Sequence, residues 1–273
     1  MGRLLAVSDL HVSYRENREV VEGLTPTGPD DWLLVAGDVA DKVADIEWTL
    51  TLLKDRFAQV VWVPGNHDLW TVNDDAAGAR GVARYEHLVA LCRRLGVLTP
   101  EDPYPVATFE GRTVRIVPMF LLYDYSWLPP GCATPEEGME YAMGTGIVCN
   151  DERLLHPDPY PSRQAWCEAR VAATERRLAG CDPEIPLVLV NHYPTVRTPT
   201  DVLWYPEFAQ WCGTELTKEW HLRFNVAAMV YGHLHIPRDT VYDGVPFKEV
   251  SLGYPREWQP RETGPGLPKN VLS

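Results

Sequence analysis

The chain has 273 residues, of which 45% are hydrophobic and 23% are charged, a composition typical of an ordinary soluble globular protein. Its formal net charge of −13 disfavours binding to long nucleic acids, because such binding requires a basic surface. No apolar run is long enough to span a bilayer, and the N-terminal segment turns polar too soon for a signal peptide. Six cysteines without a CxxC pair argue against a zinc–thiolate site and a disulfide framework, so we expect free thiols and a cytoplasmic location.

The first apolar segment, Arg3 to Ser8, predicts a buried strand that is followed by a D-x-H tripeptide at Asp9 and His11. Residues two apart on an extended segment point to the same side, so we expect this carboxylate and this imidazole to face one point beyond the strand. A single D-x-H tripeptide is weak evidence, because most such tripeptides lie on a protein surface by chance. Glu16 to Leu24 then predicts a short helix.

The second apolar segment is Trp32 to Ala36, and Gly37-Asp38 follows it directly. Glycine lets the backbone turn closely at this point, while the Asp38 side chain is expected to point into the space beyond the strand. Between Val43 and Phe57, apolar residues recur at three- and four-residue spacing, which predicts an amphipathic helix. Asp41, just before this helix, is either its N-cap or a hydrogen-bond partner of a site residue, and the two interpretations stand equal.

The third strand, Val60 to Val63, has four β-forming residues in a row, as expected for an inner parallel strand buried on both faces. Pro64-Gly65 stops this strand, and the amide, imidazole and carboxylate of Asn66-His67-Asp68 follow at once. Strand, polar terminus and helix repeat at about thirty residues, the spacing of β–α–β units in a parallel sheet. In such sheets ligands bind at the carboxyl ends of the strands, so we expect the functional site there.

The middle of the chain is less regular. A helix over Tyr85 to Leu95 and a hairpin over 107–117 lead into 121–161, a segment rich in Pro, Gly and aromatic residues. Long loops of this kind are usually functional or disordered, and the aromatic residues argue against disorder. We therefore expect an insertion that folds over the mouth of a site. Ser162 is the predicted N-cap of a helix that runs to Ala179.

Two more apolar strands end in histidines. Ile185 to Val190 precedes His192, and Ala227 to Tyr231 precedes the G-H-x-H motif of His233 and His235. Five of the eight histidines therefore lie at predicted strand termini. Buried imidazoles and carboxylates cost several kcal/mol unless they are paired or bound to metal, so core packing alone does not explain this pattern.

The remaining predictions concern the organisation of the chain. A second aromatic insertion spans 197–220, and closing strands surround the turn at Asp243-Gly244. From about residue 259 the composition becomes rich in Pro, Gly and charge, which predicts a loose tail. We expect one domain over 1–273 that carries both insertions.

Taken in order, the motifs D-x-H, G-D-x-x-D, G-N-H-D, N-H and G-H-x-H resemble those of the calcineurin-like metallophosphoesterase family, and they span Asp9 to His235. Each motif is weak alone, whereas the complete ordered set is specific. The resemblance implies an α/β fold, namely a four-layer α/β/β/α sandwich of two mixed sheets flanked by helices.

The resemblance also implies a dinuclear metal centre. Two divalent cations about 3.5–4 Å apart would polarise a phosphoryl group and lower the pKa of a bridging water, which would attack phosphorus as hydroxide. Oxygen and nitrogen ligands without sulfur suit Mn, Fe, Zn or Co. The implied ligands are Asp9, His11 and His235 for one cation, Asn66, His192 and His233 for the other, and Asp38 as the bridge.

By the same resemblance His67 would not bind metal but would stabilise the scissile phosphate or protonate the leaving oxygen. Asp68 beside it is predicted to fix the tautomer of His67 and raise its basicity, with a helix N-cap as the alternative. Arg256 could contact a substrate phosphate, but a surface arginine is the favoured interpretation. Aromatic residues of the insertions could stack on a substrate, although most are expected to pack the loops. They are Tyr123, Tyr125, Trp204, Tyr205 and Trp211.

We therefore expect a cytoplasmic phosphoesterase that hydrolyses a phosphate monoester or diester of a small molecule or nucleotide and has no membrane partner. The alternatives are a non-catalytic, metal-stabilised scaffold of the same fold and a protein phosphatase. The presence of His67 beside a complete ligand set favours an enzyme over the scaffold. A Ser/His/Asp hydrolase is disfavoured because no G-x-S-x-G motif occurs.

Overall fold

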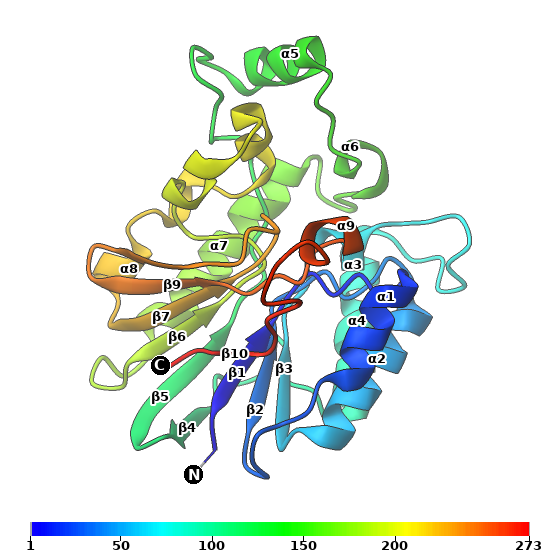
Figure 1. Cartoon of the computed structure of the whole chain (residues 1–273). Helices are drawn as coiled ribbons and strands as arrows, with labels where there is room; N and C mark the ends of the chain where they lie inside the picture. Colours follow the sequence, from blue (N-terminus) through cyan, green and yellow to red (C-terminus); the bar gives the residue numbers. More distant parts are fainter. Residues whose placement is uncertain (1, 273) are drawn as a thin grey trace.

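A computed structural model describes residues 2–272 as two facing β-sheets with helices on both outer sides (Figure 1). The strands are β1 (Leu4–Val7), β2 (Trp32–Val35), β3 (Gln59–Trp62), β4 (Val106–Phe109), β5 (Arg112–Pro118), β6 (Leu187–Val190), β7 (Val226–Tyr231), β8 (Asp239–Tyr242), β9 (Val245–Glu249) and β10 (Lys269–Asn270). One sheet has the order β10-β1-β2-β3 and the other has the order β4-β5-β6-β7-β9-β8. Both sheets are mixed, as predicted, because each combines parallel with antiparallel pairs.

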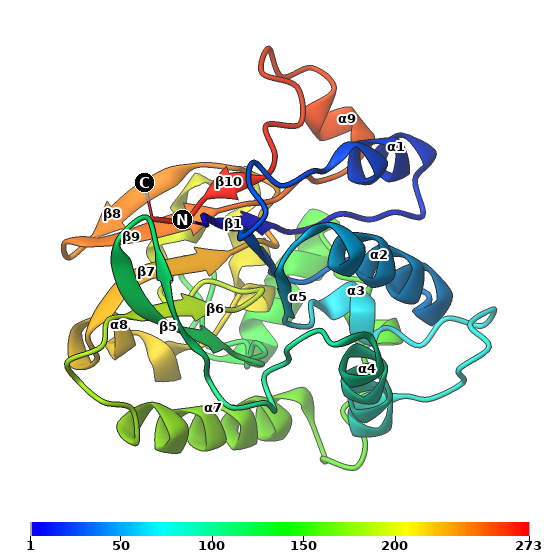
Figure 2. The same ribbon diagram turned by 90° about the horizontal axis from the view of Figure 1, so that it is seen from below.

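Helices cover the outer face of each sheet, which completes the predicted four-layer order. The α-helices are α1 (Arg15–Gly23), α2 (Val43–Arg56), α3 (Asn66–Leu69), α4 (Gly81–Leu95), α5 (Pro135–Thr145), α6 (Asp151–Leu154), α7 (Arg163–Ala179), α8 (Trp220–Arg223) and α9 (Pro255–Trp258). The 3₁₀ segments are η1 (Thr198–Val202), η2 (Pro206–Trp211) and η3 (Glu215–Thr217). Seen from below, α2 and α4 lie beside the four-stranded sheet and α7 runs along the six-stranded one (Figure 2).

Side chains alternate between the two faces of each strand, so one strand contributes to two apolar layers of the sandwich. In β1, Leu4 and Ala6 belong to the apolar cluster between the two sheets, whereas Leu5 and Val7 belong to the cluster on the helical side. Successive strand residues point to opposite faces, so a strand buried on both faces must be apolar throughout. The continuous apolar runs in the sequence therefore correspond to inner strands.

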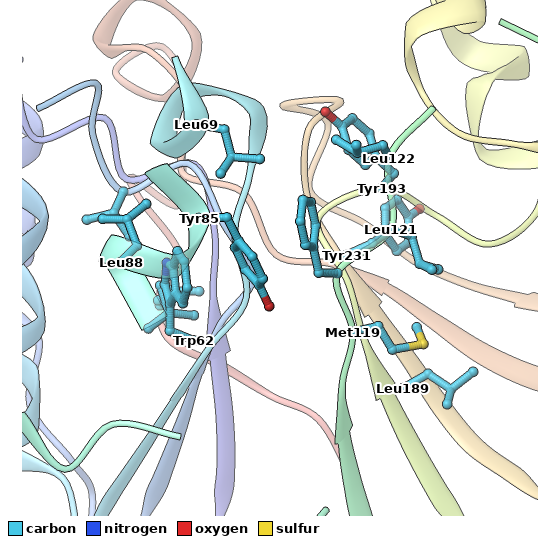
Figure 3. Packing of buried hydrophobic residues seen from close by; sticks show 14 of the residues in the cluster. Trp62, Leu69, Tyr85, Leu88, Met119, Leu121, Leu122, Leu189, Tyr193 and Tyr231 are labelled. Carbon is cyan, nitrogen blue, oxygen red and sulfur yellow. The ribbon is translucent and has the colours of Figure 1, made fainter. Parts of the chain in front are cut away.

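The helix-side cluster also reaches around the ends of the strands. Figure 3 shows Trp62, Tyr85 and Leu88 on the side of the four-stranded sheet. Tyr193 and Tyr231 lie across from them, on the side of the six-stranded sheet. All of these side chains are buried within one continuous apolar cluster. The loops that leave the strands at this end therefore rest on a packed base, which fixes their position.

The ends of two helices and the turns of two hairpins show why the chain folds as it does locally, and the predicted N-cap is confirmed. The Ser162 hydroxyl accepts a hydrogen bond from the Ala165 backbone N–H at 3.1 Å, so it is the N-cap of α7. Gly96 ends α4 with a φ of 72°, the left-handed conformation that favours glycine at a helix C-terminus. The hairpin turn at Asp243-Gly244 lies where expected, and the hairpin predicted over 107–117 turns at Glu110-Gly111.

Two predictions about organisation are wrong. The end of the chain is not a loose tail, because β10 pairs with β1 in antiparallel fashion and Val271 is buried with it. The segment 121–161 is not a pure loop, because it contains α5 and α6. Thr134 caps α5 through the Glu137 backbone N–H, and Pro135 is its first residue, so the helix had recognisable signals that its weak apolar periodicity obscured.

Two further observations concern the predictions about the cysteines and about membrane-spanning segments. All six cysteines are free thiols in the structure. Among residues 2–272, no helix combines the length and the apolar character that a membrane crossing requires.

Candidate metal centre and active site

The polar residues that follow five strands meet at one end of the sandwich, above the carboxyl ends of β1, β2, β3, β6 and β7. Many of them adopt left-handed backbone conformations that non-glycine residues rarely occupy, with φ between 41° and 70°. Such strain persists only where the surrounding structure enforces it, and it is concentrated at functional sites. The strained site residues are Asp9, His11, Asp38, His233 and His235.

Glycine is required where the loops approach one another. A Cβ atom at Gly37 would lie 2.6 Å from the Gly65 backbone nitrogen and 2.7 Å from His192 Nδ1. Contacts this short do not occur in folded proteins, so the tips of β2, β3 and β6 come together only because residue 37 has no side chain.

One group of ligand-type atoms comes from β1 and the loop after β7. His235 Nε2 lies 3.1 Å from Asp9 Oδ1 and 3.2 Å from His11 Nε2. Asp9 also accepts hydrogen bonds from the Ser251 hydroxyl and the His233 backbone N–H. These interactions leave the Asp9 carboxylate fully buried and fixed in position.

A second group comes from the tips of β3, β6 and β7. His192 Nε2 lies 3.1 Å from Asn66 Oδ1 and 3.2 Å from His233 Nδ1. The other ring nitrogen of His192 is 2.9 Å from the Ala36 carbonyl oxygen, which fixes the orientation of the imidazole. His192 is fully buried, and Asn66 is 4% exposed.

Asp38 lies between the two groups. Its Oδ2 is 3.4 Å from His192 Nε2 and 3.9 Å from His11 Nε2, while its Oδ1 accepts the His67 backbone N–H at 2.8 Å. A carboxylate in this position presents an oxygen to both groups at once. All seven residues that the sequence predicted as ligands therefore converge, and Asp38 occupies the predicted intermediate position.

These residues fit divalent cations. Two ligands bound to one cation at about 2.0–2.1 Å are separated by about 2.8–3.0 Å in octahedral and about 3.3–3.4 Å in tetrahedral geometry. The spacings of 3.1–3.2 Å within both groups lie between these values. Two pairs of imidazole nitrogens also face each other at 3.2 Å, an arrangement that a shared cation accounts for. The donor set contains only nitrogen and oxygen, as expected for Mn, Fe, Zn or Co.

The electrostatics of the buried cluster also favour positive charge at this site. Burial lowers the pKa of His192, but the Asp38 carboxylate outweighs it and the net value is about 9. Burial likewise opposes charge on His235, yet Asp9 and Glu257 bring its pKa to about 10. For His233, burial and repulsion from His192 lower the pKa to about 3. The carboxylates thus draw positive charge into the site, which protons or divalent cations can supply.

The structure corrects the predicted partner of His67. Its Nδ1 lies 2.7 Å from Asp41 Oδ1, whereas the Asp68 side chain makes no hydrogen bond to the imidazole. Of the two interpretations of Asp41, the hydrogen-bond partner is correct, since Lys42 occupies the N-cap position of α2. The Trp70 ring lies against the other side of His67, with 3.5 Å between ring centroids. Together Asp41 and Trp70 fix the plane of the imidazole.

Asp68 instead holds the backbone of the site together. Its carboxylate accepts backbone N–H groups of Asp38, Val39, Ala40 and Gly65, and Gly65 is the N-cap residue of α3. The side chain is fully buried beneath the tips of β2 and β3. A carboxylate that satisfies four backbone donors cannot also reach the His67 ring, which is why the sequence-based assignment was wrong.

Two supporting residues were missed because they lie outside the strand-tip motifs. Arg84 of α4 is 1% exposed and donates to the backbone carbonyls of Asp68 and Asp41 at 2.7 Å each. Glu257 of α9 lies with Oε2 2.7 Å from His235 Nδ1. A carboxylate on the outer nitrogen of a ligand-type histidine fixes its tautomer and raises its basicity. No local sequence signal places either residue beside the site.

A cavity of about 670 Å³ opens beside the candidate metal centre. Its lining includes Asp38, His67 and Arg256, and Arg256 is an exposed residue, as the sequence favoured. Of the aromatic residues considered earlier, most are buried in the packing of the insertions, as predicted, whereas Trp204 and Tyr205 are exposed and line the cavity. The buried ones are Tyr123, Tyr125 and Trp211.

A two-sheet sandwich with His, Asp and Asn side chains gathered at its strand ends defines a metallophosphoesterase. The profile of the family described as calcineurin-like phosphoesterase matches residues 2–237. The chain belongs to this family, and it is accordingly a phosphoric ester hydrolase. The family uses divalent metals, which agrees with the convergence of the ligand-type groups.

One relative is similar over nearly the whole chain. The acyl-carrier-protein phosphodiesterase PptH of Mycobacterium tuberculosis is 56% identical over 259 residues, which cover 95% of this chain and 80% of that protein. A crystal structure described as phosphopantetheinyl hydrolase (PptH) from the same organism superposes with a TM-score of 0.94 at 56% identity, and the match covers 96% of this chain and 93% of that chain.

Proposed function

We propose that this chain is an acyl-carrier-protein phosphodiesterase that removes a phosphopantetheinyl group from its carrier protein. Water would cleave the P–O bond to the carrier, which leaves a free hydroxyl on the carrier and phosphopantetheine as a phosphate monoester. The observation that carries this proposal is the 56% identity to PptH over 95% of the chain, a span that includes every residue of the cavity lining. The proposal replaces the small free substrate or nucleotide expected from the sequence with a protein-bound phosphodiester.

We assign the candidate centre to two divalent cations. Asp9, His11 and His235 would hold one cation, Asn66, His192 and His233 would hold the other, and Asp38 would bridge them. When bound, such a pair of cations neutralises charge on the phosphoryl oxygens and lowers the pKa of a coordinated water. The support for this assignment is the spacing of the ligand-type atoms and the absence of sulfur among them.

His67 would donate a proton to the leaving oxygen. Its Nδ1 is engaged by Asp41, which leaves Nε2, 3.9 Å from Asp38 Oδ2, as the ring nitrogen available to a substrate in the cavity. Burial lowers the pKa of His67, but the Asp38 and Asp41 carboxylates outweigh burial and raise the net pKa. A higher pKa favours the protonated imidazole that a general acid requires.

The proposed activity is tested with purified protein, Mn²⁺ and a carrier protein that bears the phosphopantetheinyl group. We expect intact-protein mass spectrometry to show the carrier losing the mass of the arm while free phosphopantetheine appears. Phosphate monoesters and nucleotides assayed side by side serve as competing substrates. A carrier that keeps its mass while a nucleotide or monoester is hydrolysed would refute this substrate assignment.

The alternatives considered from the sequence have less support. The scaffold hypothesis predicts no turnover, whereas the chain belongs to a hydrolase family and is 56% identical to a phosphodiesterase. A protein phosphatase would act on a phosphate monoester, so the same assay with a phosphorylated protein separates the two. The cytoplasmic location remains part of the proposal and is consistent with six free thiols.

A first prediction concerns Asp41. Replacing Asp41 with asparagine removes the negative charge beside His67 Nδ1, so the pKa of His67 should fall. Because His67 acts in its protonated form, the alkaline limb of the pH profile of kcat should move to lower pH, and kcat at neutral pH should fall about 10- to 100-fold. Metal content should remain that of the wild type, since Asp41 contacts no predicted ligand. An unchanged alkaline limb would show that Asp41 does not tune His67.

A further inference from the structure

The cavity is larger than a phosphodiester requires. Its volume of about 670 Å³ lies within the range of pockets that enclose drug-sized ligands, whereas the scissile group needs only the part lined by Asp38, Asn66 and His67. The rest of the cavity must therefore accept another part of the substrate or stay filled with water.

Much of this remaining part is apolar and is built by the two insertions. They contribute lining residues from 146–150 and from 203–208, none of which carries a charge, whereas the charged residues Arg256 and Glu257 of α9 also line the cavity. Trp204 is 93% exposed and Val148 is 72% exposed. Large apolar side chains left in water beside a polar centre are typical of a binding surface, because a ligand that covers them gains the free energy of their burial.

We propose that this insertion-built wall binds the phosphopantetheinyl arm while the phosphodiester lies at the candidate metal centre. The assignment rests on the proposed function. Beyond its phosphate the arm is an uncharged chain of methylenes and amides that ends in a thiol, so an uncharged apolar wall suits it. Asn150, which lines the same wall, offers a side-chain amide to the amides of the arm.

Trp204→Ala tests the wall, because Trp204 is almost fully exposed and its truncation leaves the core intact. Three substrates are compared: the phosphopantetheinyl carrier protein, a short peptide that bears the same arm, and methyl p-nitrophenyl phosphate. We expect kcat/KM to fall about tenfold more for the two arm-bearing substrates than for the simple diester. Leu222→Ala on α8 is the matched control, because it truncates another exposed apolar residue outside the cavity.

Each outcome of the Trp204→Ala comparison indicates a different role for Trp204. A selective loss for both carrier and peptide supports the arm-binding wall. A loss for the carrier alone would mean that Trp204 contacts the carrier protein, and an equal change for all three substrates would mean that it contacts neither, so both results overturn the assignment. Wild-type protein that leaves carrier and peptide intact but hydrolyses the simple diester would overturn the proposed function itself.

A different observation carries a second inference, about Asp151 of α6. Asp151 is fully buried, and its Oδ1 accepts hydrogen bonds from Asn66 Nδ2 at 3.0 Å and from Trp70 Nε1 at 2.6 Å. Asn66 is a predicted metal ligand, and the Trp70 ring lies against His67. One carboxylate oxygen from the first insertion therefore contacts two residues that shape the site.

The contact to Asn66 determines which end of its amide faces the centre. With Nδ2 bonded to Asp151, Oδ1 points toward His192 and the second group of ligands. A flipped amide would present an NH₂ group to a cation, which is repulsive. We infer that Asp151 is a positioning residue that keeps the Asn66 oxygen aimed at the metal and holds Trp70 against His67.

The test compares Asp151→Leu, which removes the acceptor, with Asp151→Asn, which retains an acceptor oxygen. The readout is the Kd for Mn²⁺ from isothermal titration of metal-stripped protein, with the folded state of each variant verified by circular dichroism. We expect Asp151→Leu to raise the Kd of one site about 10- to 100-fold and Asp151→Asn to keep most of the affinity.

Glu152→Leu is the matched control in the same helix. Glu152 accepts hydrogen bonds from Tyr125 and Trp211 and pairs with Arg163, but it contacts neither Asn66 nor Trp70. Equal loss of Mn²⁺ affinity in Glu152→Leu and Asp151→Leu would show that a loosened insertion is responsible, which overturns the inference. Wild-type affinity in Asp151→Leu would overturn it as well.

Discussion

Replacing Asp38 with asparagine is expected to abolish nearly all phosphodiesterase activity, with a fall in kcat/KM of at least about a thousandfold. Asp38 is 2% exposed and lies between the two groups of ligand-type atoms. An amide offers one neutral oxygen, whereas the carboxylate offers two oxygens that share a negative charge, so the proposed bridge between two cations would be lost. A thousandfold loss corresponds to about 4 kcal/mol of transition-state stabilisation.

Metal binding should fail together with catalysis. Wild-type protein should gain thermal stability when Mn²⁺ is added, because a ligand that binds only the folded state stabilises it. Asp38→Asn should show little of this gain, and its metal content after dialysis should drop. Asp31→Asn is the matched control, since Asp31 is also buried but accepts hydrogen bonds from the backbone N–H groups of Arg3, Thr27 and Gly28, at the amino ends of β1 and β2. It should lower stability without changing the Mn²⁺ effect. Wild-type turnover in Asp38→Asn would remove Asp38 from the bridge.

Replacing His67 with glutamine is expected to lower kcat about 10²- to 10⁴-fold while both cations stay bound. Glutamine cannot supply an ionised proton donor, but the predicted ligands are left in place. The geometry makes metal content an essential measurement, because His67, His11 and Asp38 also present ligand-type atoms within 4.8 Å of one another. If the variant lost a cation, His67 would be a ligand rather than a general acid.

The choice of leaving group tests the role of His67 more directly. An alkoxide leaving group needs a proton, whereas p-nitrophenolate is a weak base and departs without one. The kcat penalty in His67→Gln should therefore be large on the phosphopantetheinyl carrier and small on methyl p-nitrophenyl phosphate. Equal penalties on both substrates would indicate that His67 binds the phosphate instead of protonating the leaving oxygen. His87→Gln, an exposed histidine on α4, is the control and should leave both rates unchanged.

The two proposals on the insertions complement these effects at the centre. The strand-tip residues account for phosphoester hydrolysis in general, and the wall from 146–150 and 203–208 would account for the substrate. Asp151 would connect these parts, because it follows the first wall segment by one residue and bonds to Asn66. A search for relatives with the same substrate should therefore consider the insertions as well as the motifs.

The sequence by itself determined the inner strands and the residues at their tips. Strands buried on both faces must be apolar, so their runs are visible in the sequence, and a polar group placed where such a run stops is conspicuous. The predicted ligands from Asp9 to His235 lie together in the structure for this reason. Their chemistry depends on residue type and local spacing, which a linear sequence records.

Only the tertiary structure determined which carboxylate forms a hydrogen bond with which group of the site. Asp68 is adjacent to His67 in the sequence and Asp41 lies 26 residues before it, yet the path of the loops brings Asp41 to the imidazole and turns Asp68 toward four backbone N–H groups. The roles of Glu257 and Asp151 were equally unreadable, because their partners are 22 and 85 residues away. The last strand, β10, could not be predicted for the same reason. Its pairing with β1 depends on where the chain returns to the sheet, and a strand of two residues is too short to show a sequence pattern. Hydrogen bonds between distant segments leave no periodic mark in a sequence, so only the folded chain reveals them.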